Sequence, residues 1–89
     1  MSTFYCFQVV DGDTFDVSPN WLHRGVQGSR VRVANVNAPE LHEHGGQAAK
    51  QRLISAVLGK DVVLYGQALS YGRLVADVTV DGTNLRTLL

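Results

Sequence analysis

The sequence has one cysteine, two prolines and no excess of charge of either sign. With Cys6 as its single thiol, the chain cannot form an internal disulfide, and the apolar stretch around Cys6 indicates a small core residue. Eight basic residues balance eight acidic ones, which excludes the general positive field that non-specific nucleic-acid binders use. Any phosphate chemistry must therefore depend on a few well-placed arginines.

Long apolar runs are also missing. No segment approaches the roughly 20 apolar residues that a membrane helix needs, and the N-terminus lacks the basic region followed by an apolar one that marks a secretion signal. We therefore expect a protein that is soluble, has no membrane partner and is cytoplasmic by default. The 89 residues predict a single domain over 1–89, because a second core would not fit.

Aromatic, β-branched and alternating stretches predict a mainly β domain. We expect strands over residues 3–10, 14–18, 29–36, 61–65 and 74–80. In the third of these, Val31 and Val33 fall on one face, and Arg30 and Arg32 fall on the other. The turn-forming composition predicts loops over 19–28 and 66–72 and an irregular segment over 37–45.

Between the third and fourth strands the apolar period changes to that of a helix. From Gly46 onward, Ala49, Leu53, Ala56 and Val57 recur at helical spacing, and Gly59 suits the position after the helix end. Residues 84–89 predict the start of a second, C-terminal helix. Three strands, a helix and two strands is the order of a five-stranded OB-fold Greek-key barrel, so the expected class is mainly β with α.

Two carboxylates flank a glycine where the first apolar strand ends. Gly12 lets the backbone turn sharply, so that Asp11 and Asp13 can converge. Two close carboxylates repel unless a cation or a proton lies between them, and a hard cation such as Ca²⁺ takes oxygen ligands of this kind. For Asp-Gly-Asp alone, a plain hairpin turn is the commoner structure.

Three further residues have the chemistry that phosphodiester hydrolysis needs. Arg32 and Arg73 offer planar, permanently charged groups that match phosphate geometry. Glu40, after Pro39, can orient or deprotonate a water, and a metal would polarise the phosphoryl oxygen. Taken singly, each has a simpler interpretation, as an exposed strand residue, a turn residue or an acid in the first turn of a helix.

Taken in order, these motifs resemble the staphylococcal nuclease (thermonuclease) family. The resemblance covers nearly the whole chain and rests on the following motifs: Asp11-Gly12-Asp13-Thr14, Arg32 five residues before Asn37, Pro39-Glu40, Gly-x-x-Ala at 45–48, Tyr71-Gly72-Arg73-Leu74 and Asp81-Gly82. No single motif is specific, but their order and spacing are.

The resemblance implies a Ca²⁺-dependent nuclease that cleaves single-stranded or frayed DNA or RNA and leaves 3′-phosphate ends. The residues that match metal ligands are Asp11, Asp13, Asn37 (in place of an aspartate) and Ala38, through its backbone carbonyl. The residues that match catalytic and substrate-binding groups are Glu40 as general base, Arg32 and Arg73 on the phosphate, and Tyr71 on a substrate phosphate.

Asn37 is the main departure from the family pattern. An amide oxygen can still bind Ca²⁺, but a unit charge at contact distance is worth on the order of a few kcal/mol in a partly exposed site. We therefore predict weak Ca²⁺ binding, which Asn37→Asp would tighten. The alternative function is a catalytically weak or inactive nuclease-like module that binds nucleic acid or protein. A truncated or designed fragment is a third interpretation.

Several residues outside these motifs have plainer interpretations. His42, Glu43 and His44 are expected to be solvated, since their spacing in a loop is poor for a transition metal. Trp21 is interpreted as covering one end of the barrel or contacting a partner, with base stacking less favoured. Asp77 is interpreted as solvated.

The C-terminal leucines favour self-association. The chain stops where the resembled family adds one or two helices, so Leu85, Leu88 and Leu89 are expected to form an exposed apolar patch. Such a patch predicts a homodimer.

Overall fold

The computed structural model describes residues 2–89, so the first residue of the predicted domain 1–89 lies outside the described part. The elements follow in the order β1 (Phe4–Asp11), β2 (Thr14–His23), β3 (Val26–Val33), α1 (Gly46–Val57), β4 (Asp61–Ser70), β5 (Arg73–Val80), β6 (Thr83–Asn84) and a 3₁₀ helix, η1 (Leu85–Leu88).

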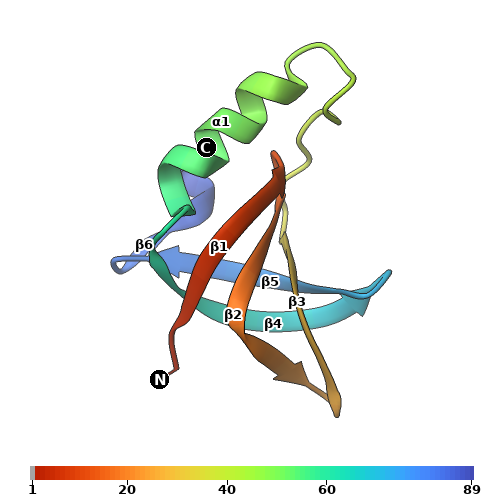
Figure 1. The fold of residues 1–89 in the computed structure, drawn as a ribbon, viewed down its shortest axis with the longest axis vertical. Coiled ribbons are helices and arrows are strands. Elements are labelled where there is room, and N and C mark those ends of the chain that lie inside the picture. Colours follow the sequence, from red (N-terminus) through yellow and green to blue (C-terminus); the bar gives the residue numbers. More distant parts are fainter. Residues whose placement is uncertain (1) are drawn as a thin grey trace.

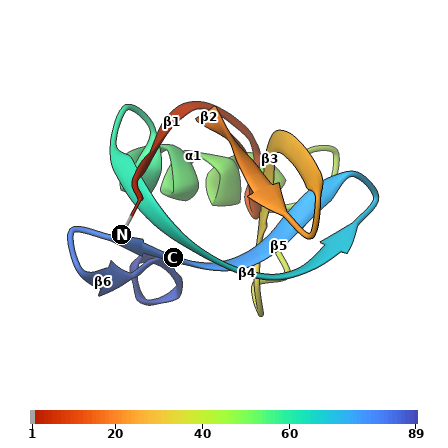
Figure 2. The same cartoon turned by 90° about the horizontal axis from the view of Figure 1, so that it is seen from below.

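The strands β1 to β5 close into a barrel, seen from two directions in Figures 1 and 2. The sheet order is β3-β2-β1-β4-β5-β6, and a further parallel pairing of β3 with β5 closes it. In that pairing Arg32 lies opposite Val75. Closure satisfies the backbone groups that an open sheet would leave at its edges. The predicted five-stranded OB-fold barrel with one helix is confirmed.

Helix α1 packs against the barrel beside the β1–β2 turn (Figure 1). Its buried residues include Ala49, Leu53, Ala56 and Val57, so the predicted apolar face is confirmed. Gly59 follows the C-cap residue with a φ of 75°, a left-handed conformation that glycine adopts without strain. The helix therefore contributes its apolar side to the same core that the strands enclose.

The interior of the barrel is built mainly from valine and alanine with a few larger side chains. Val31 and Val33 are fully buried, which confirms the inward face predicted for β3. Cys6 is also buried, and burial raises the pKa of its thiol to about 11. The cysteine is thus a protonated core residue at neutral pH. Among residues 2–89, no helix is both long and apolar enough to cross a membrane.

The predicted loop over 19–28 is wrong, because β2 continues to His23 and β3 begins at Val26. Pro19, which follows a cis peptide bond, lies where the β2–β3 pairing shifts register between Asp16 and Trp21. The β2–β3 pairing is interrupted there, so the lack of an N–H on proline does not cost the sheet a hydrogen bond. The true turn is Arg24-Gly25, with both residues at positive φ, as hairpins with two-residue loops require.

The predicted loop over 66–72 is also mostly strand. β4 continues to Ser70 and pairs with β5 as far as Arg73. Glycine suits position 66 of this strand because His23 packs over it, and a Cβ there would lie 2.9 Å from Nδ1 of His23. Tyr71-Gly72 alone forms the turn, again with both φ angles positive. At the other boundary, β3 ends at Val33, short of the predicted residue 36.

The C-terminal segment is shorter in structure than the predicted α-helical start. It forms β6 and the 3₁₀ turn η1, where the Asn84 side chain accepts a hydrogen bond from the N–H of Arg86 at 3.0 Å. Leu85 is fully buried and Leu89 packs against the core, whereas Leu88 remains about half exposed. The expected apolar patch is therefore wrong for Leu85, because the turn directs that side chain into the core.

Trp21 and Asp77 both have more partners than the sequence predicted. Trp21 is only 2% exposed, and its indole N–H donates to the carbonyl of Arg30 at 3.0 Å. Its ring is a core element with no face free for a base.

Asp77 accepts a hydrogen bond from Gln67 at 3.1 Å and lies 3.6 Å from Arg86, so the interpretation of Asp77 as solvated is wrong.

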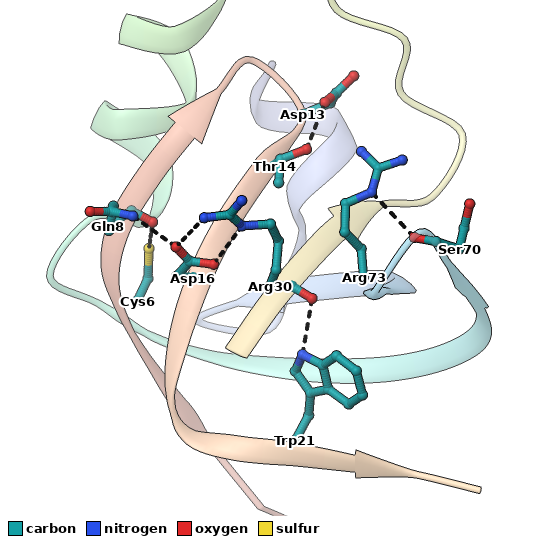
Figure 3. Close-up of polar contacts among 9 residues, drawn as sticks. All are labelled: Cys6, Gln8, Asp13, Thr14, Asp16, Trp21, Arg30, Ser70 and Arg73. Carbon is teal, nitrogen blue, oxygen red and sulfur yellow. Dashed lines mark hydrogen bonds and ion pairs between the residues drawn. The ribbon is translucent and has the colours of Figure 1, made fainter. Parts of the chain in front are cut away.

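A buried carboxylate that the sequence interpretation did not single out lies on β2. Asp16 is almost fully buried and accepts two hydrogen bonds from the guanidinium of Arg30, at 3.0 and 3.1 Å (Figure 3). The amide of Gln8 adds a third at 2.8 Å. The hydrogen bonds that Arg30 donates to Asp16 hold the pKa of Arg30 above its usual value. The three side chains join β1, β2 and β3 on one side of the barrel.

We expect Asp16→Asn to lower the free energy of unfolding by about 1–2 kcal/mol, less than the 3–5 kcal/mol typical of fully buried pairs. The expected loss of stability is smaller because the Arg30 side chain is 46% exposed and water can solvate it. Urea denaturation measures the effect. Asp61→Asn, at an exposed position on β4, is the control for loss of a charge. Equal urea midpoints for the two variants would show that the Asp16–Arg30 pair adds nothing to the free energy of unfolding.

Candidate active site

One cavity of about 290 Å³ collects the predicted site residues from the β1–β2 turn, β3, the segment after β3 and the start of β5. It is lined by Asp11, Asp13, Arg32, Asn37, Ala38, Glu40 and Arg73. Tyr71 does not line it, and at 96% exposure its side chain projects from the β4–β5 turn. The fold thus brings the predicted metal-binding and catalytic positions together and leaves the predicted substrate-contacting tyrosine outside.

The β1–β2 turn packs tightly against its neighbours. A Cβ at Gly12 would lie 2.6 Å from Cβ of Ala38 and 2.7 Å from Cβ of Ala49. Only glycine therefore allows the turn to fit between the segment after β3 and helix α1. The turn therefore lies beside Ala38, and Asp11, Asp13 and Ala38 line the same cavity.

Asp11 and Asp13 lie close enough to influence one another. Burial raises the pKa of Asp11, and a hydrogen bond with the side chain of Asp13 raises it further. The backbone N–H of Asp13 donates to Oδ1 of Asp11 at 3.1 Å, which opposes that rise. Two carboxyl groups in this position favour a shared proton or a cation between them.

The carboxylate of Asp13 is largely occupied by donors from the protein. Its Oδ1 accepts from the hydroxyl of Thr14 at 2.9 Å, and its Oδ2 accepts from the N–H of Ala38 at 3.2 Å. These bonds fix the orientation of Asp13 and join the β1–β2 turn to the segment after β3.

Arg32 reaches from β3 across the same cavity. Its Nη2 donates to Oδ1 of Asn37 at 2.9 Å and lies 3.4 Å from Oδ2 of Asp13. Its Nη1 donates to the carbonyl of Val33. The side chain is mostly buried, so its guanidinium is held in place by groups of the candidate metal site.

Glu40 is positioned by its backbone and not by its carboxylate. Its N–H donates to Oε1 of Glu43 at 2.8 Å, and the N–H of Glu43 donates back to the Glu40 carbonyl at 2.9 Å. A Cβ at Gly46 would lie 1.9 Å from that carbonyl oxygen, so the first residue of α1 must be glycine. The Glu40 side chain is 73% exposed, with His42 at 3.6 Å.

The sequence interpretation missed the roles of Glu43 and Gly46 in holding Glu40. Residue types alone do not signal the turn that Glu43 closes on Glu40, and the close approach to Gly46 depends on how the segment folds back. His42, Glu43 and His44 are exposed, as predicted. Among the described residues, no three His, Cys, Asp or Glu side chains gather into a metal cluster.

Arg73 enters the cavity from the first position of β5. Its Nε donates a long hydrogen bond, 3.4 Å, to the carbonyl of Ser70, and Figure 3 shows its guanidinium directed toward the end of the barrel where Asp13 lies. The parallel β3–β5 pairing brings Arg73 near Arg32. A second cavity, also about 290 Å³, shares both arginines and includes Ser70. Arg32 and Arg73 therefore line both cavities.

Comparison with known proteins decides the family. The model of the family described as staphylococcal nuclease homologue matches residues 30–89. The chain belongs to this family. The match includes Arg32, Asn37, Glu40 and Arg73, and it begins after the two aspartates of the β1–β2 turn.

Two relatives of the chain carry an endonuclease name. Proteins named "Uncharacterized endonuclease", from Escherichia coli O157:H7 and Escherichia coli, are 34% identical over 84 residues, which cover 92% of this chain and 52% of each relative. The chain thus spans about half the length of the curated relatives it matches.

The oxygen donors fit the Ca²⁺ that staphylococcal nuclease homologues typically use. Asp11 and Asp13 supply two carboxylates whose mutual repulsion a cation would relieve, and Asn37 and Ala38, which carry neutral oxygens, line the same cavity. Hard cations take oxygen ligands of these types. These four residues provide two carboxylates, so their total negative charge is smaller than that of a site with three.

Proposed function

We propose that the protein is a Ca²⁺-dependent nuclease that hydrolyses phosphodiester bonds of DNA or RNA and leaves 3′-phosphate ends. The observation that supports this most strongly is the shared cavity, in which Arg32 and Arg73 lie with Asp11, Asp13 and Glu40. Carboxylates alone would repel a phosphodiester, and arginines alone could bind it but not activate water.

The proposed chemistry assigns one task to each side chain. The exposed carboxylate of Glu40 accepts a proton from a water molecule whose oxygen attacks phosphorus. The bond from phosphorus to the 5′ oxygen breaks, and this oxygen takes a proton from solvent. Arg32 and Arg73 stabilise the negative charge that grows on the phosphoryl oxygens, because guanidinium groups are charged and planar.

The proposed Ca²⁺ ligands are the carboxylates of Asp11 and Asp13, the amide oxygen of Asn37 and the backbone carbonyl of Ala38. When bound, the cation supplies charge neutralisation at the phosphoryl oxygen and a more acidic water. Weak binding is expected, since Asn37 contributes no charge.

The proposed substrate is single-stranded or frayed nucleic acid. A chain with no net charge has few groups to hold a duplex backbone by phosphate contacts alone. Tyr71 is proposed to contact a substrate phosphate from the β4–β5 turn, two residues before Arg73. Its almost complete exposure leaves the hydroxyl free to do so.

A cleavage assay on single-stranded DNA and RNA, with Ca²⁺ against chelator, tests the proposed function. We expect cutting only with Ca²⁺, and products that a polymerase extends only after a phosphatase removes their 3′-phosphate. Absence of cutting at every Ca²⁺ concentration would favour the alternative, a nuclease-like module that binds nucleic acid or protein. The contact of Arg32 with Asn37 and Asp13 is the observation that favours this alternative, because it occupies candidate ligand atoms.

A homodimer is the proposed assembly, with Leu88 as the exposed apolar side chain of the C-terminal turn. We expect the dimer to appear as protein concentration rises, because one leucine per copy buries little area. Light scattering over a concentration series measures the mass. Leu88→Lys is the disrupting variant, and a monomeric mass at the highest concentration would remove the prediction.

A further inference from the structure

We propose that the guanidinium of Arg32 and a divalent cation compete for the same oxygen atoms, so that cation binding releases Arg32 toward the substrate phosphate. The inference rests on the proposed function, since it assigns the cation to Asp11, Asp13 and Asn37. It adds a coupling between two parts of the site that the proposed chemistry treats as independent.

The first observation is that Arg32 contacts two of the proposed ligand atoms through one nitrogen. Its Nη2 donates to Oδ1 of Asn37 at 2.9 Å and lies 3.4 Å from Oδ2 of Asp13. An amide oxygen that binds a charged donor at this distance is a poor ligand for a cation, because both positive groups approach the same lone pairs.

The second observation is that Asp13 has little spare capacity. Thr14 and the backbone N–H of Ala38 already donate to its two oxygens. A carboxylate accepts about four hydrogen bonds in all, so Thr14, Ala38 and Arg32 leave Asp13 about one free position, and a cation there would lie next to the Arg32 guanidinium. Like charges that close together repel, and the guanidinium has to move or the cation binds weakly.

The third observation is the position of Arg32 between two cavities. It lines the carboxylate cavity and also the second cavity, which it shares with Arg73 and Ser70. A guanidinium no longer bonded to Asn37 therefore remains beside Arg73, where a phosphate would meet two arginines. Because coupling between ligands is reciprocal, the same contact that weakens cation binding withholds Arg32 from substrate until the cation arrives.

Arg73 offers a matched control within the same cavity. It carries the same charge, but it donates its long hydrogen bond to the Ser70 carbonyl, which is not a proposed ligand. Removing Arg73 changes the electrostatic potential in the cavity. Removing Arg32 changes the potential as well, and it also frees the oxygens of Asn37 and Asp13 that Arg32 contacts.

The test measures cation affinity without nucleic acid. Ca²⁺ is titrated calorimetrically, and Tb³⁺ by luminescence, into the parent, Arg32→Gln, Arg73→Gln and Arg32→Lys proteins. A hydrogen bond from a charged donor corresponds to roughly tenfold in affinity, so Arg32→Gln should bind Ca²⁺ about tenfold more tightly than the parent. Arg73→Gln should stay within about threefold of it, and Arg32→Lys should fall between.

A second readout uses the parent protein alone. The side-chain Nε–H signal of Arg32, assigned by NMR through its absence in Arg32→Lys, should shift and gain mobility as Ca²⁺ is added, whereas that of Arg73 should change less. This measurement carries the test if Arg32→Gln does not fold, as circular dichroism will show.

The outcomes separate this inference from the proposed function. Equal Ca²⁺ affinities for Arg32→Gln and Arg73→Gln, or an Arg32 signal unchanged at saturating Ca²⁺, overturn the competition, while Ca²⁺-dependent cleavage would still support the nuclease. Absence of Ca²⁺ binding in every protein overturns both the competition and the proposed cation site.

Discussion

Glu40→Gln is expected to lower kcat by roughly 10²–10⁴-fold, the usual contribution of a general base. The substitution keeps the shape of the side chain and leaves its backbone bonds with Glu43 in place, but it removes the group that accepts the proton of the attacking water. Ca²⁺ affinity and oligonucleotide binding should remain near those of the parent, because Glu40 is not among the proposed ligands.

Single-turnover cleavage of a labelled single-stranded oligonucleotide at saturating Ca²⁺ measures the loss. Asp61→Asn, which removes one carboxylate from an exposed position on β4, is the control for a change in net charge and should cut at the parental rate. A parental rate for Glu40→Gln would assign the base to another group. A loss of Ca²⁺ binding together with activity would instead make Glu40 a ligand.

Arg73→Ala is expected to lower kcat by about 10²-fold or more, as for other preorganised donors to transition-state charge. Its hydrogen bond to Ser70 is long, so little stability should be lost with it. Arg73→Lys should restore only part of the rate, since an ammonium keeps the charge but loses the planar fork. Arg32→Ala is expected to cause a loss of the same order.

The role of guanidinium geometry is separated from that of charge by comparing Arg73→Ala with Arg73→Lys and Arg24→Ala. Arg24 lies exposed in the β2–β3 turn, away from the cavity, and its removal controls for the loss of one positive charge. Cleavage rates at saturating substrate report kcat, and urea denaturation reports stability. Full activity of Arg73→Lys would argue against a bidentate phosphate contact.

Much of the fold follows from local features of the sequence. Alternation placed Val31 and Val33 inside the barrel, and helical spacing placed Leu53 and its neighbours against it, because these periods depend only on backbone geometry. The order of strands and helix was enough to predict the OB-type barrel. Strand lengths were not predictable, since Arg24-Gly25 and Tyr71-Gly72 form tight hairpin turns without the Asn-Gly or Asp-Gly signal typical of them.

The residues of the candidate site could be named from the sequence, because carboxylates and arginines stood in motifs with recognisable order and spacing. Their roles remain proposals. The sequence also shows that the chain has no net charge and that position 37 is an asparagine, so we expect phosphate binding to rely on a few arginines and cation binding to be weak.

Only the tertiary structure decided which of these groups touch. The parallel pairing of β3 with β5 brings Arg32 and Arg73 to one cavity, and pairing of segments so far apart leaves no local signal. The bond from Arg32 to Asn37 and the burial of Asp16 against Arg30 likewise depend on side-chain direction across strands. Residue type and spacing determine what chemistry is available, whereas the closure of the barrel determines which charges are near enough to act on one another.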